Sequence, residues 1–156
     1  EVSPQFFKTT FANYELIASE NDRVFDYENR VYRPFMTDQL LLKQLMTILF
    51  DNAIKYTEED GKIEFVVHAT DRHLYLTVTD NGIGISAADK KKIFDRFYRV
   101  DKARTRQKGG FGLGLSLAKQ IVDALRGTIS VKDNKPRGTI FEVKIAIQSP
   151  SKRKNK

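Results

Sequence analysis

Four glycines lie close together in a stretch that could bind an anion. Gly109, Gly110, Gly112 and Gly114 lead directly into a segment whose apolar residues have helical spacing. Glycine lets the backbone approach a ligand closely, and free N–H groups at the start of a helix attract phosphate. Leu115 stands where a Walker phosphate loop has its lysine, and no Gly-x-Gly-x-x-Gly dinucleotide motif is present. The stretch predicts either a flexible surface loop or a phosphate site completed from elsewhere in the chain.

The polar residue Asn52 falls on an otherwise apolar face of a predicted helix, which Thr37 or Asp38 could cap and which should end near Tyr56. Burying an unpartnered amide costs about 1–3 kcal/mol, so Asn52 needs a polar partner. A backbone carbonyl or a buried water would serve, but the amide oxygen also suits Mg²⁺. Lys55 and Tyr56 would then offer a phosphate counter-charge and a ring against a flat ligand. The remaining members of this face are Leu45, Ile48, Leu49 and Ala53.

A carboxylate ends a predicted core strand. Leu74, Leu76, Val78 and Asp80 alternate along the sequence, so the Asp80 side chain should face the core. A buried carboxylate needs a hydrogen-bond donor, because an unpaired one is costly. The following residues, 81–84, read Asn-Gly-Ile-Gly and could form a hairpin turn, but no alternating strand resumes after them. Asp80 is therefore a candidate for binding a donor group of a ligand.

The basic segment before the glycines has the composition of a lid. Its cations would oppose the charge of a polyphosphate. Just upstream, Ile93, Phe94 and Phe97 have helical spacing and are expected in the core, although the aromatic pair could also anchor the base of the lid. The basic residues of this segment are Arg99, Lys102, Arg104, Arg106 and Lys108.

These candidate residues must be positioned by an alternation of helices and strands. Two predicted hairpins have a two-residue periodicity. His68 lies opposite the apolar residues of the first hairpin and His73 lies at its turn, so both are expected to be solvated. We expect helices near 6–20, 38–56, 87–98 and 113–125, and strands near 24–27, 31–35, 63–69, 74–80, 128–132 and 139–147.

The length and composition of the chain exclude several classes of protein. A chain of 156 residues with 40% hydrophobic residues builds one domain, expected over 1–148, with a basic disordered tail over 149–156. It contains no cysteine, which excludes disulfides and thiolate metal sites. The net charge is +7, but four of these charges come from the tail, which argues against nucleic acid as a partner. There is no apolar run long enough to span a membrane and no initiating methionine, so an excised fragment is expected.

The ordered set of motifs resembles the catalytic ATP-binding domain of bacterial sensor histidine kinases, which belongs with the gyrase, chaperone and mismatch-repair ATPases. Its first elements are Asn52 with Lys55, followed by residues 80–84. Residues 94–97, Phe-Asp-Arg-Phe, and the glycine-rich residues 110–116 complete it. The resemblance extends over roughly residues 6–147. It implies a two-layer α/β (α+β) sandwich with a mixed five-stranded sheet, about three helices on one face, and an ATP lid.

The resemblance also implies a role for each site residue. Asn52 would hold Mg²⁺, and Lys55 and Arg99 would act beside it on the phosphates of ATP. Asp80 would accept from the adenine amino group, and Gly82 and Gly84 would let the backbone pass the base. The remaining cofactor-binding residues would be Tyr56, Ile85, Phe97, Gly110, Gly112, Leu113 and Gly114.

Two departures from the family matter. Ile48 stands one turn before Asn52, where other members of the superfamily carry a glutamate that activates water. Its side chain takes no proton, which favours phosphoryl transfer over ATP hydrolysis and removes a second polar contact at the metal. His68 and His73 are not followed by an acidic residue, as the family's phosphoacceptor histidine is.

The resemblance therefore implies the ATP-binding half of a protein-histidine kinase. Its partners would be a phosphoacceptor hairpin of the same dimeric parent and then a response regulator. The location would be the cytoplasmic side of a bacterial membrane, reached only through the parent. The alternatives are a serine-directed kinase of the same superfamily, a degenerate nucleotide sensor, or a basic nucleic-acid binder.

Overall fold

The computed structural model describes residues 1–95 and 114–150. In this part of the chain, five strands form one sheet in the order β1-β2-β3-β5-β4. Strands β1 and β2 are parallel and the other neighbours are antiparallel. The elements are α1 (Pro4–Glu20), β1 (Val24–Arg30), α2 (Gln39–Tyr56), β2 (Lys62–Ala69), β3 (His73–Asp80), α3 (Ala87–Lys90), α5 (Gly114–Ala124), β4 (Thr128–Asp133) and β5 (Thr139–Ala146).

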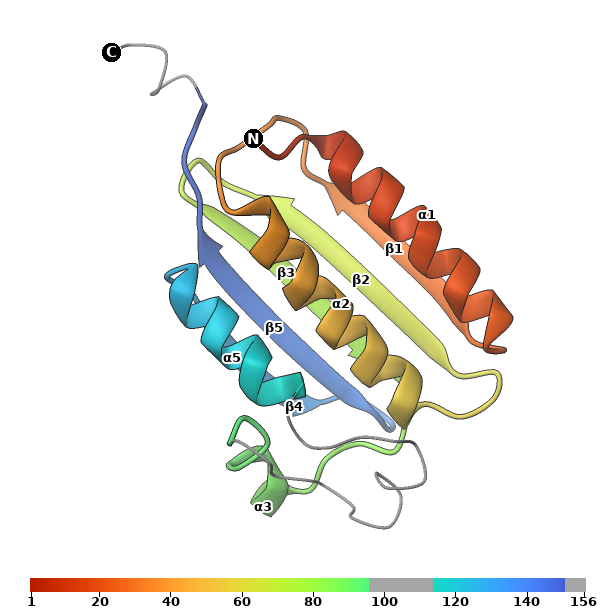
Figure 1. The fold of residues 1–156 in the computed structure, drawn as a ribbon. Helices are drawn as coiled ribbons and strands as arrows, with labels where there is room; N and C mark the ends of the chain where they lie inside the picture. The colour runs from red at the N-terminus through yellow and green to blue at the C-terminus, as the bar shows by residue number, and fades with distance from the viewer. Residues whose placement is uncertain (96–113, 151–156) are drawn as a thin grey trace.

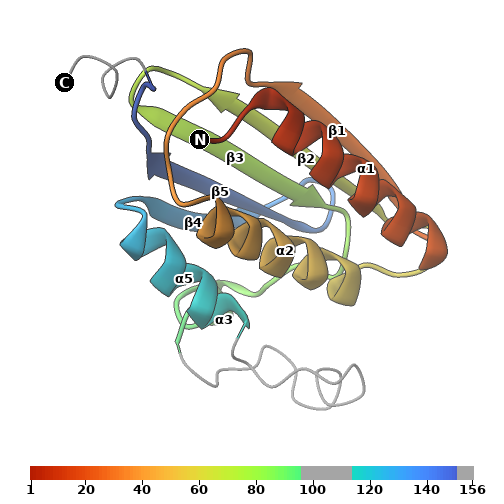
Figure 2. The ribbon, with the colours of Figure 1, turned by 45° about the horizontal axis from the view of Figure 1, so that its top comes forward.

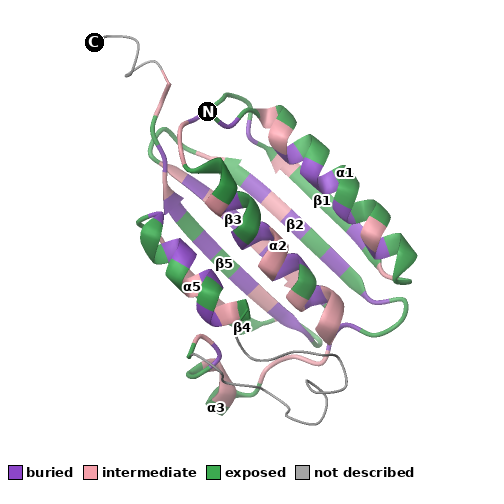
Figure 3. Ribbon diagram, viewed as in Figure 1, coloured by how far each residue is buried: buried purple, intermediate pink, exposed green. Residues whose placement is uncertain are grey.

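Helices α1, α2 and α5 lie together on one face of the sheet (Figures 1 and 2). This arrangement confirms the predicted two-layer α/β fold with a mixed five-stranded sheet. Burial alternates along β2 and β3, so one face of each strand packs against the helices and the other faces outward (Figure 3). The core therefore lies between the sheet and these three helices.

Helix α2 carries several predicted site residues, and both of its ends are well defined. At the start, the Asp38 side chain accepts a hydrogen bond from the backbone N–H of Leu41 at 3.0 Å, so Asp38 is the cap. At the end, the helix stops at Tyr56, as predicted. Between them one face is buried, through Leu42, Leu45, Met46, Leu49, Phe50 and Ala53.

Aromatic packing holds α1 against α2 and the sheet. The rings of Tyr14 and Phe50 stack with centroids 4.3 Å apart and an interplanar angle of 5°. The Tyr14 hydroxyl lies 2.9 Å from the Thr47 hydroxyl, and burial raises the pKa of Tyr14 to about 12. Phe11, Phe25 and Phe65 close the same cluster. Phe50 of α2 is thus packed against large buried rings of α1 and the sheet.

Two predicted elements and one predicted burial differ in the structure. The predicted strand at 31–35 is wrong: β1 continues to Arg30, and this stretch contributes only an isolated bridge between Val2 and Phe35. The helix predicted over 87–98 is shorter among the described residues, since α3 ends at Lys90 and turns follow. Leu117, whose four-residue spacing with Ile121 predicts a place on the buried face of α5, is 45% exposed, and the buried apolar residues of this helix are Ala118, Ile121 and Val122.

Several predictions concern residues outside the described ranges. These are the basic lid, Phe97, Arg99, Gly110, Gly112, Leu113 and the tail from residue 151. No helix among residues 1–95 and 114–150 is both long and apolar enough to cross a membrane.

Candidate functional site

The described candidate residues gather at one end of the sheet. The last turn of α2, the end of β3 and the start of β5 meet there, and α3 and the first turn of α5 lie beside them (Figure 1). In the antiparallel pairing of β3 with β5, Asp80 lies opposite Thr139. Residues far apart in the sequence thus border one region.

Asp80 is the most deeply buried acidic residue of this region, with 3% of its surface exposed. The backbone N–H of Gly82 donates to Oδ1 of Asp80 at 2.8 Å, and the backbone N–H of Thr139 also donates to this carboxylate. Burial raises the pKa of the Asp80 carboxyl to about 6, and these two hydrogen bonds oppose the increase. The inward orientation predicted from the strand alternation is confirmed.

Gly82 brings the loop after β3 against the end of α2. A Cβ built on Gly82 would stand 2.0 Å from the Tyr56 carbonyl oxygen and 3.0 Å from Oδ1 of Asp80. The next residue fixes this contact, because the Ile83 N–H donates to the Tyr56 carbonyl at 3.0 Å. Only a residue without a side chain fits here, so the loop and the helix end form one unit.

Asn52 lies one turn before the end of α2 and Lys55 lies in its last turn, and both are half buried. The Asn52 amide makes no hydrogen bond with any residue that the structure describes. Lys55 lies close enough to Asp51 for its charge to lower the pKa of that carboxyl, although burial raises that pKa by more. An amide oxygen and an ammonium near the end of α2 fit a Mg²⁺-bound polyphosphate.

Ile48 borders the start of α5. A Cβ on Gly114, the first residue of α5, would lie 3.7 Å from Cγ2 of Ile48. The position one turn before Asn52 is thus occupied by a half-buried apolar side chain. This side chain offers no base for activating water.

The remaining described candidates lie in the same region. Gly84 has a φ of +77° and a Cβ on it would meet the Gly138 carbonyl oxygen at 3.4 Å. Ile85 is half buried and packs against the core. Tyr56 is half buried at the end of α2. The structure therefore brings together eight predicted residues, namely Asn52, Lys55, Tyr56, Asp80, Gly82, Gly84, Ile85 and Gly114, with Ile48 bordering them.

The sequence reasoning missed two residues of this region, Gly138 and Thr139. A Cβ on Gly138, whose φ is +114°, would stand 1.9 Å from the Asp80 carbonyl oxygen, so β5 begins in direct contact with the end of β3. The pairing of the two predicted hairpins could have identified Gly138 and Thr139 as part of this region. A register that places Thr139 opposite Asp80 puts both residues at the site.

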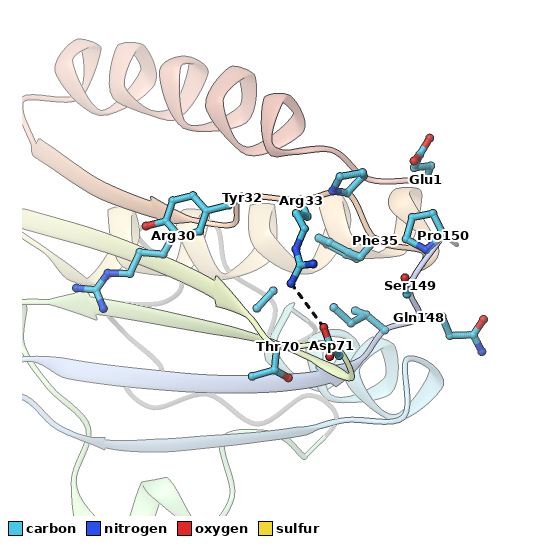
Figure 4. Close-up of a pocket in the computed structure, with 13 residues that line it drawn as sticks. Glu1, Arg30, Tyr32, Arg33, Phe35, Thr70, Asp71, Gln148, Ser149 and Pro150 are labelled. Carbon is cyan, nitrogen blue, oxygen red and sulfur yellow. Dashed lines mark ion pairs between the residues drawn. The ribbon is translucent and has the colours of Figure 1, made fainter. Parts of the chain in front are cut away.

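The structure also contains a hollow of about 450 Å³ at the opposite end of the sheet (Figure 4). It is lined by Arg30, Tyr32, Arg33, Thr70 and Asp71, among others, and Arg33 pairs with Asp71 at 3.8 Å. None of the predicted site residues lines it. The hollow is therefore separate from the region around Asp80.

Comparison with known proteins assigns the fold to a family. The family described as "Histidine kinase-, DNA gyrase B-, and HSP90-like ATPase" matches residues 37–149. The sensor protein CiaH of Streptococcus pneumoniae serotype 4 is 80% identical over 154 residues, covering 99% of this chain and 35% of CiaH. The histidine-protein kinase ArlS of Staphylococcus aureus strain USA300 is 45% identical over 101 residues, covering 65% of this chain and 22% of ArlS.

Solved structures give the same assignment. The histidine kinase ThkA, solved in complex with the response regulator protein TrrA, superposes with a TM-score of 0.74 at 26% identity, covering 98% of this chain and 42% of the ThkA chain. The chain spans about a third of the length of CiaH, and its match with ArlS covers a smaller share of that protein. On the family match, the fold and the sequence likeness, this chain belongs to the histidine kinase-, DNA gyrase B- and HSP90-like ATPases.

Proposed function

We propose that this chain is the ATP-binding half of a sensor histidine kinase and presents the γ-phosphate of Mg·ATP to a histidine on a separate helical hairpin. The observation that carries the proposal is the buried, oriented carboxylate of Asp80. It faces a region bordered by the Asn52 amide, which has no hydrogen-bond partner among residues 1–95 and 114–150, and by Lys55, in a chain of an ATPase family. The family assignment does not favour the nucleic-acid-binding alternative.

Asp80 is suited to recognising adenine. Its carboxylate is held by the N–H groups of Gly82 and Thr139 and keeps acceptor capacity for a further donor. The 6-amino group of adenine is such a donor, whereas guanine has an oxygen at that position. Gly82 and Gly84 let the backbone pass the base, and Tyr56 and Ile85 would flank it together with Phe97. Asp80 thereby selects adenine over guanine.

The phosphate chain would lie against the end of α2 and the start of α5. Asn52 would hold Mg²⁺, and Lys55 and Arg99 would oppose the remaining charge. Gly110, Gly112, Leu113 and Gly114 would contribute backbone contacts. The bound metal would neutralise phosphate charge, and the chain itself would orient the γ-phosphate.

The placement of Ile48 and His68 supports transfer to a separate acceptor. Ile48 provides no base for water, so hydrolysis is disfavoured. His68 stacks on Tyr75 on the exposed side of β2, and it lies five residues from Ile63, the strand partner of Asp80. Five residues of strand span about 16 Å. In the transfer, the bond from the γ-phosphorus to the bridging oxygen breaks, a bond to the acceptor nitrogen forms, and ADP leaves.

The partners follow from the same proposal. The acceptor hairpin would belong to a dimeric parent, and a response regulator would receive the phosphoryl group next. ThkA, solved with the response regulator TrrA, supports this class of partner. The parent would be anchored in the membrane with this domain on the cytoplasmic side.

The proposal is tested by phosphoryl transfer from γ-labelled ATP. The chain is mixed with a histidine-bearing hairpin of a sensor kinase or with a serine substrate. We expect label on the hairpin, labile in acid and stable in alkali, and none when the acceptor histidine is replaced by glutamine. Label on serine would support the serine-directed alternative. Label on this chain alone would contradict a separate acceptor.

A further inference from the structure

The turn between β4 and β5 is bonded to the loop that carries Asp80. The Asn134 side-chain amide donates to the Asp80 carbonyl oxygen at 2.9 Å. Nε of Arg137 donates to the Gly82 carbonyl oxygen at 2.8 Å. Both donors come from a turn that is 54 or 55 residues further along the chain. Neither Asn134 nor Arg137 belongs to the sequence motifs from which the site was predicted.

These two hydrogen bonds hold two peptide groups of the loop that follows the recognition carboxylate. The peptide after Asp80 is held through its oxygen by Asn134. The peptide after Gly82 is held through its oxygen by Arg137 and through its N–H by the Tyr56 carbonyl, at 2.8 and 3.0 Å. The Gly82 N–H that orients Oδ1 of Asp80 belongs to the peptide between these two, so it is held in place from both sides.

The turn is itself braced and can serve as a support. The Asn134 N–H donates to the Gly138 carbonyl at 3.1 Å, which closes the turn. Asp133, the last residue of β4, pairs with Lys90 of α3 at 2.6 Å. The Arg137 guanidinium also lies 3.8 Å from Glu58, just after α2. The turn therefore connects α3, the end of α2 and the loop after β3.

We propose that Asn134 and Arg137 are positioning residues that set the preference of the site for adenine by holding the loop from Asp80 to Gly82. This inference rests on the proposed function. Neither side chain contacts the base; each acts through a backbone carbonyl of the loop. When both bonds are lost, the Asp80 carboxylate is no longer held where the 6-amino group arrives.

The test compares ATP with purine riboside triphosphate, which has hydrogen in place of the 6-amino group. Dissociation constants are measured by calorimetry for the wild type, Asn134→Ala, Arg137→Ala and the double variant. We expect the constant for ATP to rise about 2- to 10-fold for each lost hydrogen bond, and that for the analogue to change less than about twofold. Lys135→Ala is the matched control, because it removes a cation from the same turn and should leave both constants unchanged.

Two further measurements separate positioning from a general loss of structure. Arg137→Lys, which keeps a donor, should restore part of the preference for ATP. In an Asp80→Asn background, the substitutions at 134 and 137 should no longer change the ATP-to-analogue ratio, because the carboxylate they position is gone. A thermal melt of each variant gives its stability independently.

Each outcome decides the inference. A double variant that keeps the wild-type ratio, or that weakens both ligands equally, overturns it while the proposed function stands. A persistent effect in the Asp80→Asn background overturns it as well. If the wild type itself does not prefer ATP to the analogue, the adenine role of Asp80 fails and the inference fails with it.

Discussion

The carbonyl oxygen of Tyr56 and the α-carbon of Gly82 lie so close that a Cβ on residue 82 would stand 2.0 Å from that oxygen. This contact joins the end of α2, which carries Asn52 and Lys55, to the loop that orients Asp80. The phosphate-binding and base-binding sides of the proposed site are thus one packed unit, and disturbing the contact should disturb both.

Gly82→Ala is expected to displace this loop and weaken ATP binding by at least about tenfold, since the new methyl group also approaches Oδ1 of Asp80 at 3.0 Å. Calorimetric titration with ATP measures the loss, and a thermal melt measures stability.

Gly127→Ala is the matched control for that substitution. Its Cβ would stand 2.0 Å from the Lys144 carbonyl oxygen, near the end of β5 away from Thr139. It should lower stability in the same way and leave the ATP affinity of the folded protein unchanged. Full ATP affinity in Gly82→Ala, or an equal loss in both variants, would contradict the proposed unit.

Asp80→Asn is expected to stabilise the fold while abolishing the preference for adenine. The pKa of Asp80 is about 6 in the folded protein, above its ordinary value of 3.8, so the folded state binds the proton more tightly than the unfolded chain. The free energy of unfolding therefore falls as the pH rises from about 4 to 6, and it stays lowered above pH 6. This loss of stability is at most about 3 kcal/mol at pH 7.5.

Denaturant unfolding at pH 4.5 and pH 7.5 checks this prediction. Asp80→Asn should be more stable than the wild type at pH 7.5, and the gain should shrink at pH 4.5. A variant that is less stable at both pH values would show that the carboxylate is a structural requirement.

The affinity for ATP should depend on the ionisation of Asp80. As the pH falls through about 6, protonation removes an acceptor oxygen, and the preference for ATP over purine riboside triphosphate should decline. Because the phosphates of the two ligands titrate alike, their affinity ratio reports the carboxyl alone. A ratio that stays constant from pH 5 to pH 8 would mean that Asp80 does not contact the 6-amino group.

Arg23→Ala should destabilise the end of α2. The Arg23 guanidinium donates to the carbonyl oxygens of Ile54 and Thr57 at 3.2 and 2.5 Å, and Nε donates to the Thr57 hydroxyl at 3.1 Å. These bonds satisfy helix-end carbonyls, so their loss should cost about 1–3 kcal/mol. Arg33→Ala, whose ion pair with Asp71 is largely exposed, should cost less than about 1 kcal/mol. Equal unfolding midpoints for the two variants would refute the role of Arg23.

Local periodicity was enough to predict the elements that present the site. The alternation of residues 74–80 oriented Asp80 inward, and the apolar face of α2 together with a capping residue located Asn52 near the helix end. These features depend on residues only a few positions apart, so they can be recognised in a single sequence.

The rest of the site depends on contacts between distant segments. Asn134 and Arg137 lie in an ordinary hairpin turn, and only the β3–β5 register brings that turn to Asp80. Leu117 has the spacing of a buried residue, yet the packing of α5 leaves it exposed. Residues 31–35 have a strand-like composition, but the pairing of β1 with β2 ends before them, at Arg30.

The most direct test of the central claim is a calorimetric titration of the chain with ATP, with and without Mg²⁺, repeated with GTP and with Asp80→Asn. We predict binding that favours ATP over GTP, strengthens with Mg²⁺, and loses its adenine preference in the variant. Absence of binding at millimolar ATP, or equal affinity for the two nucleotides, would contradict the assignment of this region as an ATP site.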